Sequence, residues 1–242
     1  GNRWQVMIAP RNLITVPYGQ VGAVVRFSPK LVNSYRSSDT RGTASVINYA
    51  AEGIASKENF SLLYDSQREY TGYGIKKYAP LAIWQQADDG TWSEVNEVMG
   101  KDIGASEYQI SPYQDFIVVR YADVLLMAAE LGSPNAQDYL NQVRDRAFGG
   151  DTSQRVTVTE ASIRNERMLE FAFEGLRYWD LLRRGVSEAA AEIAEIRTLL
   201  SGGSEDVVTI ESERIVTTRG LSQIPNNQIT LSNNVLKQNA GW

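Results

Sequence analysis

The stretch Thr159–Gly185, TEASIRNERMLEFAFEGLRYWDLLRRG, carries the strongest structural signal in the chain. On a helical wheel its apolar side chains cover one broad arc, and its acidic side chains lie on the other side. Because the apolar arc takes up about half of the circumference, the pattern predicts one long, largely buried helix. The apolar positions are Met168, Leu169, Phe171, Ala172, Leu176, Tyr178, Trp179 and Leu182.

Three glutamates, Glu166, Glu170 and Glu174, recur at i,i+4 on this predicted helix and would repel one another. An unpaired carboxylate in a protein interior is costly, so these side chains need cations nearby. We expect Arg144 and Arg146, on the preceding predicted helix, to supply part of that charge, because guanidinium groups pair well with carboxylates.

Within the stretch, Arg177 stands three residues from both Glu174 and Asp180, and we expect it to pair with both. Two chemical alternatives exist for the glutamates, a glycosidase carboxylate pair and a two-metal carboxylate site. Carboxylates stacked along one helix do not face each other across a cleft, and the Glu-x-x-His partners of a di-metal site are missing. We therefore interpret the glutamates as part of a network that holds helices together.

Two more helices are predicted just before this stretch. Apolar residues at helical spacing begin near Val119 and stop at Gly132, and Ser133-Pro134 then opens a second helix that stops at Gly149-Gly150. The tight turn makes an αα-hairpin, and its small residues allow the close packing of tetratricopeptide-like repeats. A further helix over Ser187–Leu200 would pair with the long one.

The remaining segments give weaker signals. Ser28-Pro29 begins a short helix through about Tyr35, and Asp88-Asp89-Gly90 joins two β-forming runs, Ala82–Gln86 and Thr91–Val95, in a predicted hairpin. Residues 1–27 and 99–115 are predicted as loops, 40–78 as a weak β-leaning pattern, 207–210 as a short strand and the last twenty residues as an extended tail.

The predicted fold class is therefore mainly α, with tetratricopeptide-like helix pairs, irregular loops and a small β-hairpin. We expect a single domain over 1–242, loop-rich in 1–115, helical in 116–201 and extended in 202–242.

Composition excludes several kinds of chemistry. The 242 residues include no cysteine and no histidine, which removes disulfides, thiol catalysis, Ser-His-Asp triads and most transition-metal sites. The net charge of −5 without a basic stripe argues against nucleic acid as a partner. No apolar run approaches the length of a membrane span, Gly1 opens no signal peptide, and no phosphate-loop or calcium-loop spacing is present. We expect no cofactor and no metal.

The run ERMLEFAFEGLRYWDLLRRG resembles the ERRxELAFEGxRxxDLxRxG signature of the SusD/RagB family of surface glycan-binding lipoproteins. Five more segments match that family in its usual order, with Thr40 standing where proline is common. They are Ser28–Arg41 (SPKLVNSYRSSDTR), Ile75–Tyr78 (IKKY), Val119–Glu130 (VRYADVLLMAAE), Tyr139–Phe148 (YLNQVRDRAF) and Leu221–Trp242.

The resemblance implies a non-catalytic protein at the outer face of the outer membrane. Such a protein captures oligosaccharide or polysaccharide, or peptide in some relatives, and delivers it to a SusC-like TonB-dependent transporter. Family members carry an N-terminal lipid anchor and a helical N-terminal half, and by this resemblance we expect the present sequence to contain neither. We therefore expect it to correspond to the C-terminal region of such a lipoprotein.

Aromatic rings stack on the apolar faces of sugars, so the 5 Trp, 12 Tyr and 6 Phe supply the candidate ligand residues. We expect core packing for those on helices, namely Tyr121, Tyr139, Phe171, Tyr178 and Trp179. By the family's pattern, the candidate ligand residues are Trp4 and Tyr18, with Arg11 and Asn12 between them.

Two alternatives to glycan binding are a helical-repeat scaffold that contacts a protein partner, such as the transporter, and a hydrolase. The hydrolase is disfavoured because the chain has no recognisable nucleophile or facing carboxylate pair.

Overall fold

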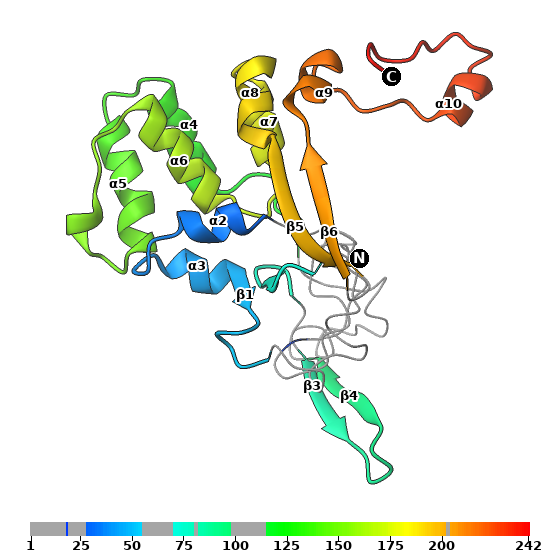
Figure 1. Ribbon diagram of the computed structural model, residues 1–242. Coiled ribbons are helices and arrows are strands. Elements are labelled where there is room, and N and C mark those ends of the chain that lie inside the picture. The colour runs from blue at the N-terminus through cyan, green and yellow to red at the C-terminus, as the bar shows by residue number, and fades with distance from the viewer. Residues whose placement is uncertain (1–17, 19–27, 55–69, 80–81, 98–114, 202–203) are drawn as a thin grey trace. The chain divides into compact units, whose positions relative to one another are not determined.

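The computed structural model describes residue 18 and residues 28–54, 70–79, 82–97, 115–201 and 204–242 (Figure 1). Contacts divide the chain into two compact units, Gly1–Glu174 with Leu200–Ser204 and Gly175–Leu199 with Glu205–Trp242. The loops predicted over 1–27 and 99–115 lie outside the described residues, except for Tyr18 and Asp115. The described residues are mainly helical, with short two-stranded pairings, so the predicted fold class is confirmed.

The first unit contains two short β pairings and a group of three longer helices (Figure 1). Strand β1 pairs antiparallel with β2, and β3 pairs antiparallel with β4. The elements are α2 (Pro29–Ser34), α3 (Thr40–Ser45), β1 (Val46–Asn48), β2 (Tyr73–Ile75), β3 (Ala82–Gln86), β4 (Trp92–Glu97), α4 (Tyr121–Glu130), α5 (Ala136–Ala147) and α6 (Glu160–Glu170).

Local sequence signals explain several of these elements. Ser28 caps α2 by accepting a hydrogen bond from the backbone N–H of Lys30 at 3.1 Å, and Pro29 occupies the first helical position. The predicted β3–β4 hairpin is confirmed, and Gly90 in its turn has φ 82°, a left-handed conformation that favours glycine.

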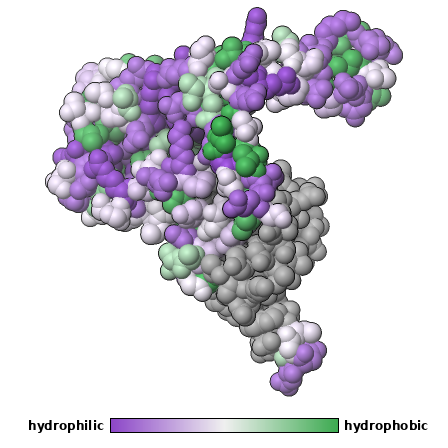
Figure 2. All heavy atoms as spheres, viewed as in Figure 1, coloured by the Kyte–Doolittle hydropathy of each residue, from purple (hydrophilic) through white to green (hydrophobic). Residues whose placement is uncertain are grey.

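The predicted αα-hairpin is also confirmed. Helices α4 and α5 pack against each other and both contact α6 (Figure 1). Their buried faces contribute Leu125 and Leu126 from α4 and Leu140 and Val143 from α5. On the face shown in Figure 2, hydrophilic side chains predominate over this group of helices. The three helices thus form a small layered bundle with its apolar faces inside.

The prediction of a single helix over 159–185 is wrong. Helix α6 ends at Glu170 and α7 (Arg177–Leu182) begins after a five-residue turn, in which Phe173 and Gly175 have φ of 68° and 79°. A right-handed helix cannot continue through left-handed residues. The turn places the Phe173 ring against the buried cluster of Val46, Ile75 and Tyr78, so tertiary packing overrides the helical pattern.

The second unit contains short elements. In order they are α7, α8 (Val186–Ile193), β5 (Glu195–Ser201), β6 (Ser204–Ile210), α9 (Ser212–Thr217) and α10 (Asn226–Leu231), although the end of β5 and the first residue of β6 fall within Leu200–Ser204 of the first unit. The helix predicted over Ser187–Leu200 is half right, because α8 stops at Ile193 and the following residues form β5, which pairs with β6. The predicted strand at 207–210 is confirmed as part of β6.

The C-terminal segment is more ordered than the extended tail that we predicted. Helix α10 follows Pro225, and Gln238 fixes the backbone of Ile224 through two hydrogen bonds of 2.8 Å, one accepted and one donated. A side-chain amide that serves both groups of one residue mimics a strand partner, which periodicity does not reveal.

The expected burial of helical aromatics holds only in part. Phe171 is buried, but Tyr121 and Trp179 are 71% and 64% exposed. For Trp179 the reason is the turn at 171–175, which resets the helical phase so that the predicted apolar arc does not continue into α7. No helix among the described residues has the length and apolar character needed to cross a bilayer.

Candidate functional site

A group of charged side chains, most of them buried, lies in the first unit, and we call it the Arg–Glu cluster. Its core is Glu166, which is 0% exposed and accepts hydrogen bonds from Arg41 and Arg144, each at 2.6 Å. The members of the cluster are Asp39, Arg41, Lys77, Arg120, Arg144, Arg146, Glu166, Glu170 and Glu174.

Glu170 has the most cation partners among the three glutamates of the cluster. One carboxylate oxygen accepts from Arg41 at 3.1 Å, and the other accepts from Arg120 and Arg146. Burial acts to raise the pKa of Glu170, but hydrogen bonds and charge from Arg146 and Arg120 outweigh it and lower the pKa to about 2. The carboxylate is therefore ionised at neutral pH and acts as an acceptor.

Glu174 extends the cluster beyond the end of α6. Its carboxylate accepts from Arg120, with the nearest Nε–Oε2 distance at 2.9 Å, and from Lys77. Burial lowers the pKa of Lys77, although Glu174 favours its charged form. The turn that breaks the predicted helix is what brings Glu174 to these two partners.

The prediction that Arg144 and Arg146 would pair with the glutamates is confirmed. The expected Glu174–Arg177 pair is wrong, because the Arg177 guanidinium lies 3.5 Å from Glu192 instead. Asp180 accepts from Arg183 at 3.2 Å.

Sequence reasoning missed Arg41, Lys77 and Arg120 as partners of the glutamates, although each lies in one of the short segments quoted above. Each of these segments supplies one cation to the glutamates of the cluster. Every carboxylate of the cluster has a cation partner, so the cluster binds α3, α4, α5 and α6 together.

An open groove on the first unit is the best candidate for a binding site. Its volume is about 480 Å³, which lies within the range of small-molecule sites. Apolar side chains form part of its wall, and polar groups that can bond a hydroxyl stand beside them. The lining residues are Val32, Tyr35, Gly42, Thr43, Val46, Asn48, Ala51, Glu52 and Lys76.

Tyr18, one of the predicted ligand residues, is connected to this groove. Its hydroxyl donates to Glu52 at 2.6 Å, and Lys76 bonds the other oxygen of Glu52 at 3.1 Å. Lys76 also lies 5.9 Å from the centre of the Tyr18 ring. Burial and the neighbouring Glu52 raise the pKa of Tyr18, which stays protonated as a donor.

The Tyr18 ring itself is 1% exposed and packs with Ile47 and Tyr49. It therefore positions Glu52 at the groove instead of presenting a ring face to solvent. Trp4, Arg11 and Asn12, the other predicted ligand residues, lie outside the described residues. The groove residues Asn48 and Lys76 were not selected from the sequence, where nothing marks them as close to Tyr18.

Metal binding finds no support in the part of the chain that the structure describes, where acidic side chains form no group of three arranged for a cation. The carboxylates of the Arg–Glu cluster have cation partners, as given above.

Comparison with known proteins gives a family match over nearly the whole chain. The model described as the SusD family matches residues 5–242. Among curated proteins, SusD-like protein P38 of Formosa agariphila is 33% identical over 139 residues, 48% of this chain and 26% of that protein. SusD-like protein P25 of the same organism is 41% identical over 80 residues, 29% of this chain and 15% of that protein.

Solved structures show the same fold. Surface glycan-binding protein A from Bacteroides thetaiotaomicron, solved in complex with laminarihexaose, is 24% identical with a TM-score of 0.68 and covers 100% of this chain. The corresponding protein from Bacteroides fluxus is 24% identical, with a TM-score of 0.70 over 100% of this chain.

The chain spans about half the length of these solved proteins, 47% and 46% respectively. Its sequence segments, its tetratricopeptide-like helix pair and the family match over 5–242 agree. The chain belongs to the SusD family.

Proposed function

We propose that this chain contributes to the non-catalytic binding of oligosaccharide or polysaccharide at the cell surface. The observation that carries the proposal is the family match over residues 5–242, together with similar folds whose names describe glycan-binding proteins. Binding would rest on stacking and hydrogen bonding without bond cleavage, with affinity from several weak contacts.

The groove lined by Tyr35, Asn48, Glu52 and Lys76 supports this proposal as a place for a sugar ring. Its apolar wall suits the C–H face of a sugar, and its amide, carboxylate and ammonium groups suit the hydroxyls. Tyr18 holds Glu52 in position, as its 2.6 Å hydrogen bond indicates.

Trp4, Arg11 and Asn12 remain our proposed direct ligand residues, together with Tyr18 acting through Glu52. By family membership, we also propose that the full-length protein is lipid-anchored in the outer membrane. There it would deliver its ligand to a SusC-like TonB-dependent transporter.

Affinity electrophoresis against a panel of polysaccharides, paired with an assay for released reducing sugar, tests the proposal. Retarded migration without sugar release supports it, and release would identify a hydrolase instead. Lys76→Gln should weaken the retardation, while Lys30→Gln serves as its control, because Lys30 is exposed and does not line the groove. Loss of retardation in Trp4→Ala would support Trp4 as a ligand residue. Unchanged retardation would exclude Trp4 from the binding site.

A second candidate function is contact with a protein partner through the helix pair. Its support is the exposed apolar side chains of α4 and its C-cap, with Tyr121 71%, Val124 47% and Leu131 87% exposed. Isolated apolar residues on a surface are ordinary, but several on one helix suit an interface. Co-purification of the transporter with the parent protein but not with a Val124→Glu variant would support this role.

A further inference from the structure

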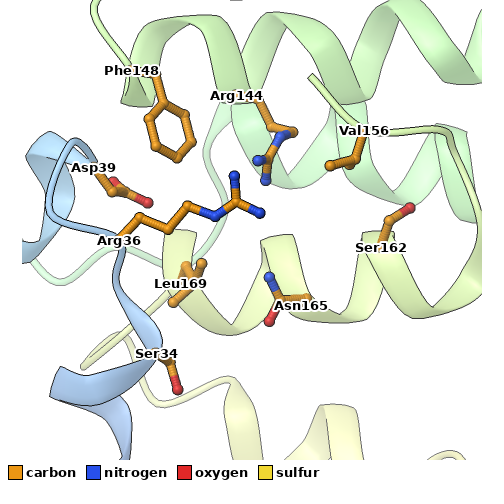
Figure 3. A pocket seen from close by; sticks show the side chains of 9 residues that line it. All are labelled: Ser34, Arg36, Asp39, Arg144, Phe148, Val156, Ser162, Asn165 and Leu169. Carbon is orange, nitrogen blue, oxygen red and sulfur yellow. The ribbon is translucent and has the colours of Figure 1, made fainter. Parts of the chain in front are cut away.

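A second, smaller pocket lies on the first unit between the α2–α3 connection, α5 and α6 (Figure 3). Its volume is about 160 Å³. Figure 3 shows the guanidinium groups of Arg36 and Arg144 directed toward the same space, with Ser162 and Asn165 of α6 at its other side. The lining residues are Ser34, Arg36, Asp39, Arg144, Phe148, Val156, Ser162, Asn165 and Leu169.

Most charges at this pocket are already neutralised. Asp39 accepts two hydrogen bonds from the side chain of Arg41, at 2.7 and 2.9 Å. Arg144 donates to Glu166 at 2.6 Å and to the backbone carbonyl of Gln154 at 2.6 and 2.9 Å. These two arginines and two carboxylates leave no net charge between them.

Arg36 is different. Its Nη1 donates to the neutral side-chain carbonyl of Gln154 at 2.9 Å, and no carboxylate among the described residues lies within ion-pair distance of it. Within the same described part of the chain, no acceptor is assigned to its Nε and Nη2 groups, and none to the amide of Asn165. The pocket therefore carries one unneutralised positive charge, in a chain whose net charge is −5.

We infer that this pocket is a subsite for the oxyanion substituent, a carboxylate or a sulfate ester, of an acidic sugar. Arg36 would bond the two oxygens in the fork geometry that guanidinium groups offer, and the Asn165 amide would donate to the same group. The inference rests on the proposed glycan binding and adds the class of glycan.

The pocket's size fits this assignment. A volume of about 160 Å³ is below that of sites that enclose a whole ligand, about 300 to 1,000 Å³. The pocket thus takes a substituent and leaves the remainder of the saccharide outside. No covalent step is involved, so the only effect of the pocket would be to favour the binding of acidic glycans over neutral ones.

Isothermal titration calorimetry on the whole chain tests this with three ligands. They are an oligogalacturonide, which carries carboxylates, a sulfated carrageenan oligosaccharide, and neutral laminarihexaose. Arg36→Gln should weaken binding of an acidic ligand about tenfold, because a charge-assisted bond to a charged group is lost. The ligand that loses affinity identifies carboxylate or sulfate as the preferred group.

Arg155→Gln is the control, since Arg155 is also exposed but pairs with Asp145 and does not line the pocket. It removes the same charge and should leave acidic-ligand binding unchanged. Equal losses of affinity for the acidic ligand in the two variants would show that only the overall charge of the protein matters. That result would overturn the inference. Binding of the neutral ligand should not change in Arg36→Gln.

Two outcomes separate this inference from the proposed function. If the chain binds laminarihexaose but neither acidic ligand, glycan binding stands and the oxyanion subsite is refuted. If no oligosaccharide binds, the proposed function fails, and free glucuronate and inorganic sulfate are titrated while the Asn165 side-chain amide is followed by NMR. A shift abolished by Arg36→Gln supports the subsite, and the absence of any shift overturns it.

Discussion

At the scale of single residues, Glu166 shows how much depends on one carboxylate. Its side chain is fully buried between Arg41 and Arg144, and replacing it with alanine leaves both guanidinium groups short of a partner. We expect Glu166→Ala to lower the free energy of unfolding by about 3 to 5 kcal/mol. Urea denaturation followed by circular dichroism measures this.

The control for that variant lies on the same helix. Glu160 is largely exposed and pairs with Arg164, so Glu160→Ala should change the unfolding free energy by less than about 1 kcal/mol. Similar losses for the two glutamates would contradict the central role of the buried one.

The pH dependence of stability is set in part by Glu170. Its pKa is about 2 in the folded chain, below its ordinary value of 4.5. A lowered acid pKa stabilises the fold fully above about pH 4.5, and that contribution, about 3 kcal/mol, is lost as the pH falls toward 2. Thermal melts at steps of pH measure the loss.

Glu170→Gln, which cannot ionise, should flatten the stability profile between pH 4.5 and 2. Glu160→Gln should retain the profile of the parent chain. A Glu170→Gln profile as steep as the parent's would assign the acid sensitivity to other carboxylates.

At the scale of elements, the turn between α6 and α7 depends on left-handed backbone. Gly175 has φ 79°, where a β-carbon is strained. We expect Gly175→Ala to cost about 1 kcal/mol of stability, Gly175→Asn less and Gly175→Val more, because asparagine tolerates this region and β-branched residues do not. Denaturant midpoints for the three variants give the order of their stabilities. The opposite order would contradict a left-handed backbone at Gly175.

The β1–β2 pairing depends on a close approach of another kind. A β-carbon on Gly74 would stand 2.5 Å from the hydroxyl of Tyr49. We expect Gly74→Ala to destabilise the fold by about 1 to 3 kcal/mol through overpacking. Adding Tyr49→Phe removes the contacted oxygen and should restore part of the loss, so a double-mutant cycle with no coupling would contradict this contact.

At the scale of the whole molecule, burial is unevenly distributed. Helices α4, α5 and α6 of the first unit each bury several side chains, whereas α9 and α10 of the second unit bury none. We expect hydrogen exchange, read by mass spectrometry, to be slowest in α4–α6 and fast in α9 and α10. Equally slow hydrogen exchange in α10 and α6 would contradict the difference in burial between these two helices.

The same contrast explains what the sequence could reveal. The cap at Ser28, the hairpin around Gly90 and the α4–α5 pair are set by neighbouring residues, so local patterns predicted them. The break after Glu170 and strand β5 depend on distant partners, which periodicity does not record. Family resemblance, in contrast, identified the segments that meet at the Arg–Glu cluster without revealing that they meet.

For the candidate site, sequence reasoning selected Tyr18, which bonds Glu52 of the groove, but did not select the groove residues themselves. The groove joins residues from 32 to 76, and only folding brings Asn48 and Lys76 together in its lining. No local sequence pattern distinguishes Arg36 either. Its unneutralised charge becomes apparent only when the partners of the nearby arginines are known.

The separation of Arg41 from its two glutamate acceptors has a consequence during protein synthesis. Arg41 precedes Glu166 by 125 residues and Glu170 by 129. At roughly 5 to 20 residues per second, a ribosome takes on the order of ten seconds to make the chain between them. Until its glutamates leave the exit tunnel, Arg41 has Asp39, two residues away, as its described partner, and the Arg–Glu cluster can form only after α6 has been synthesised.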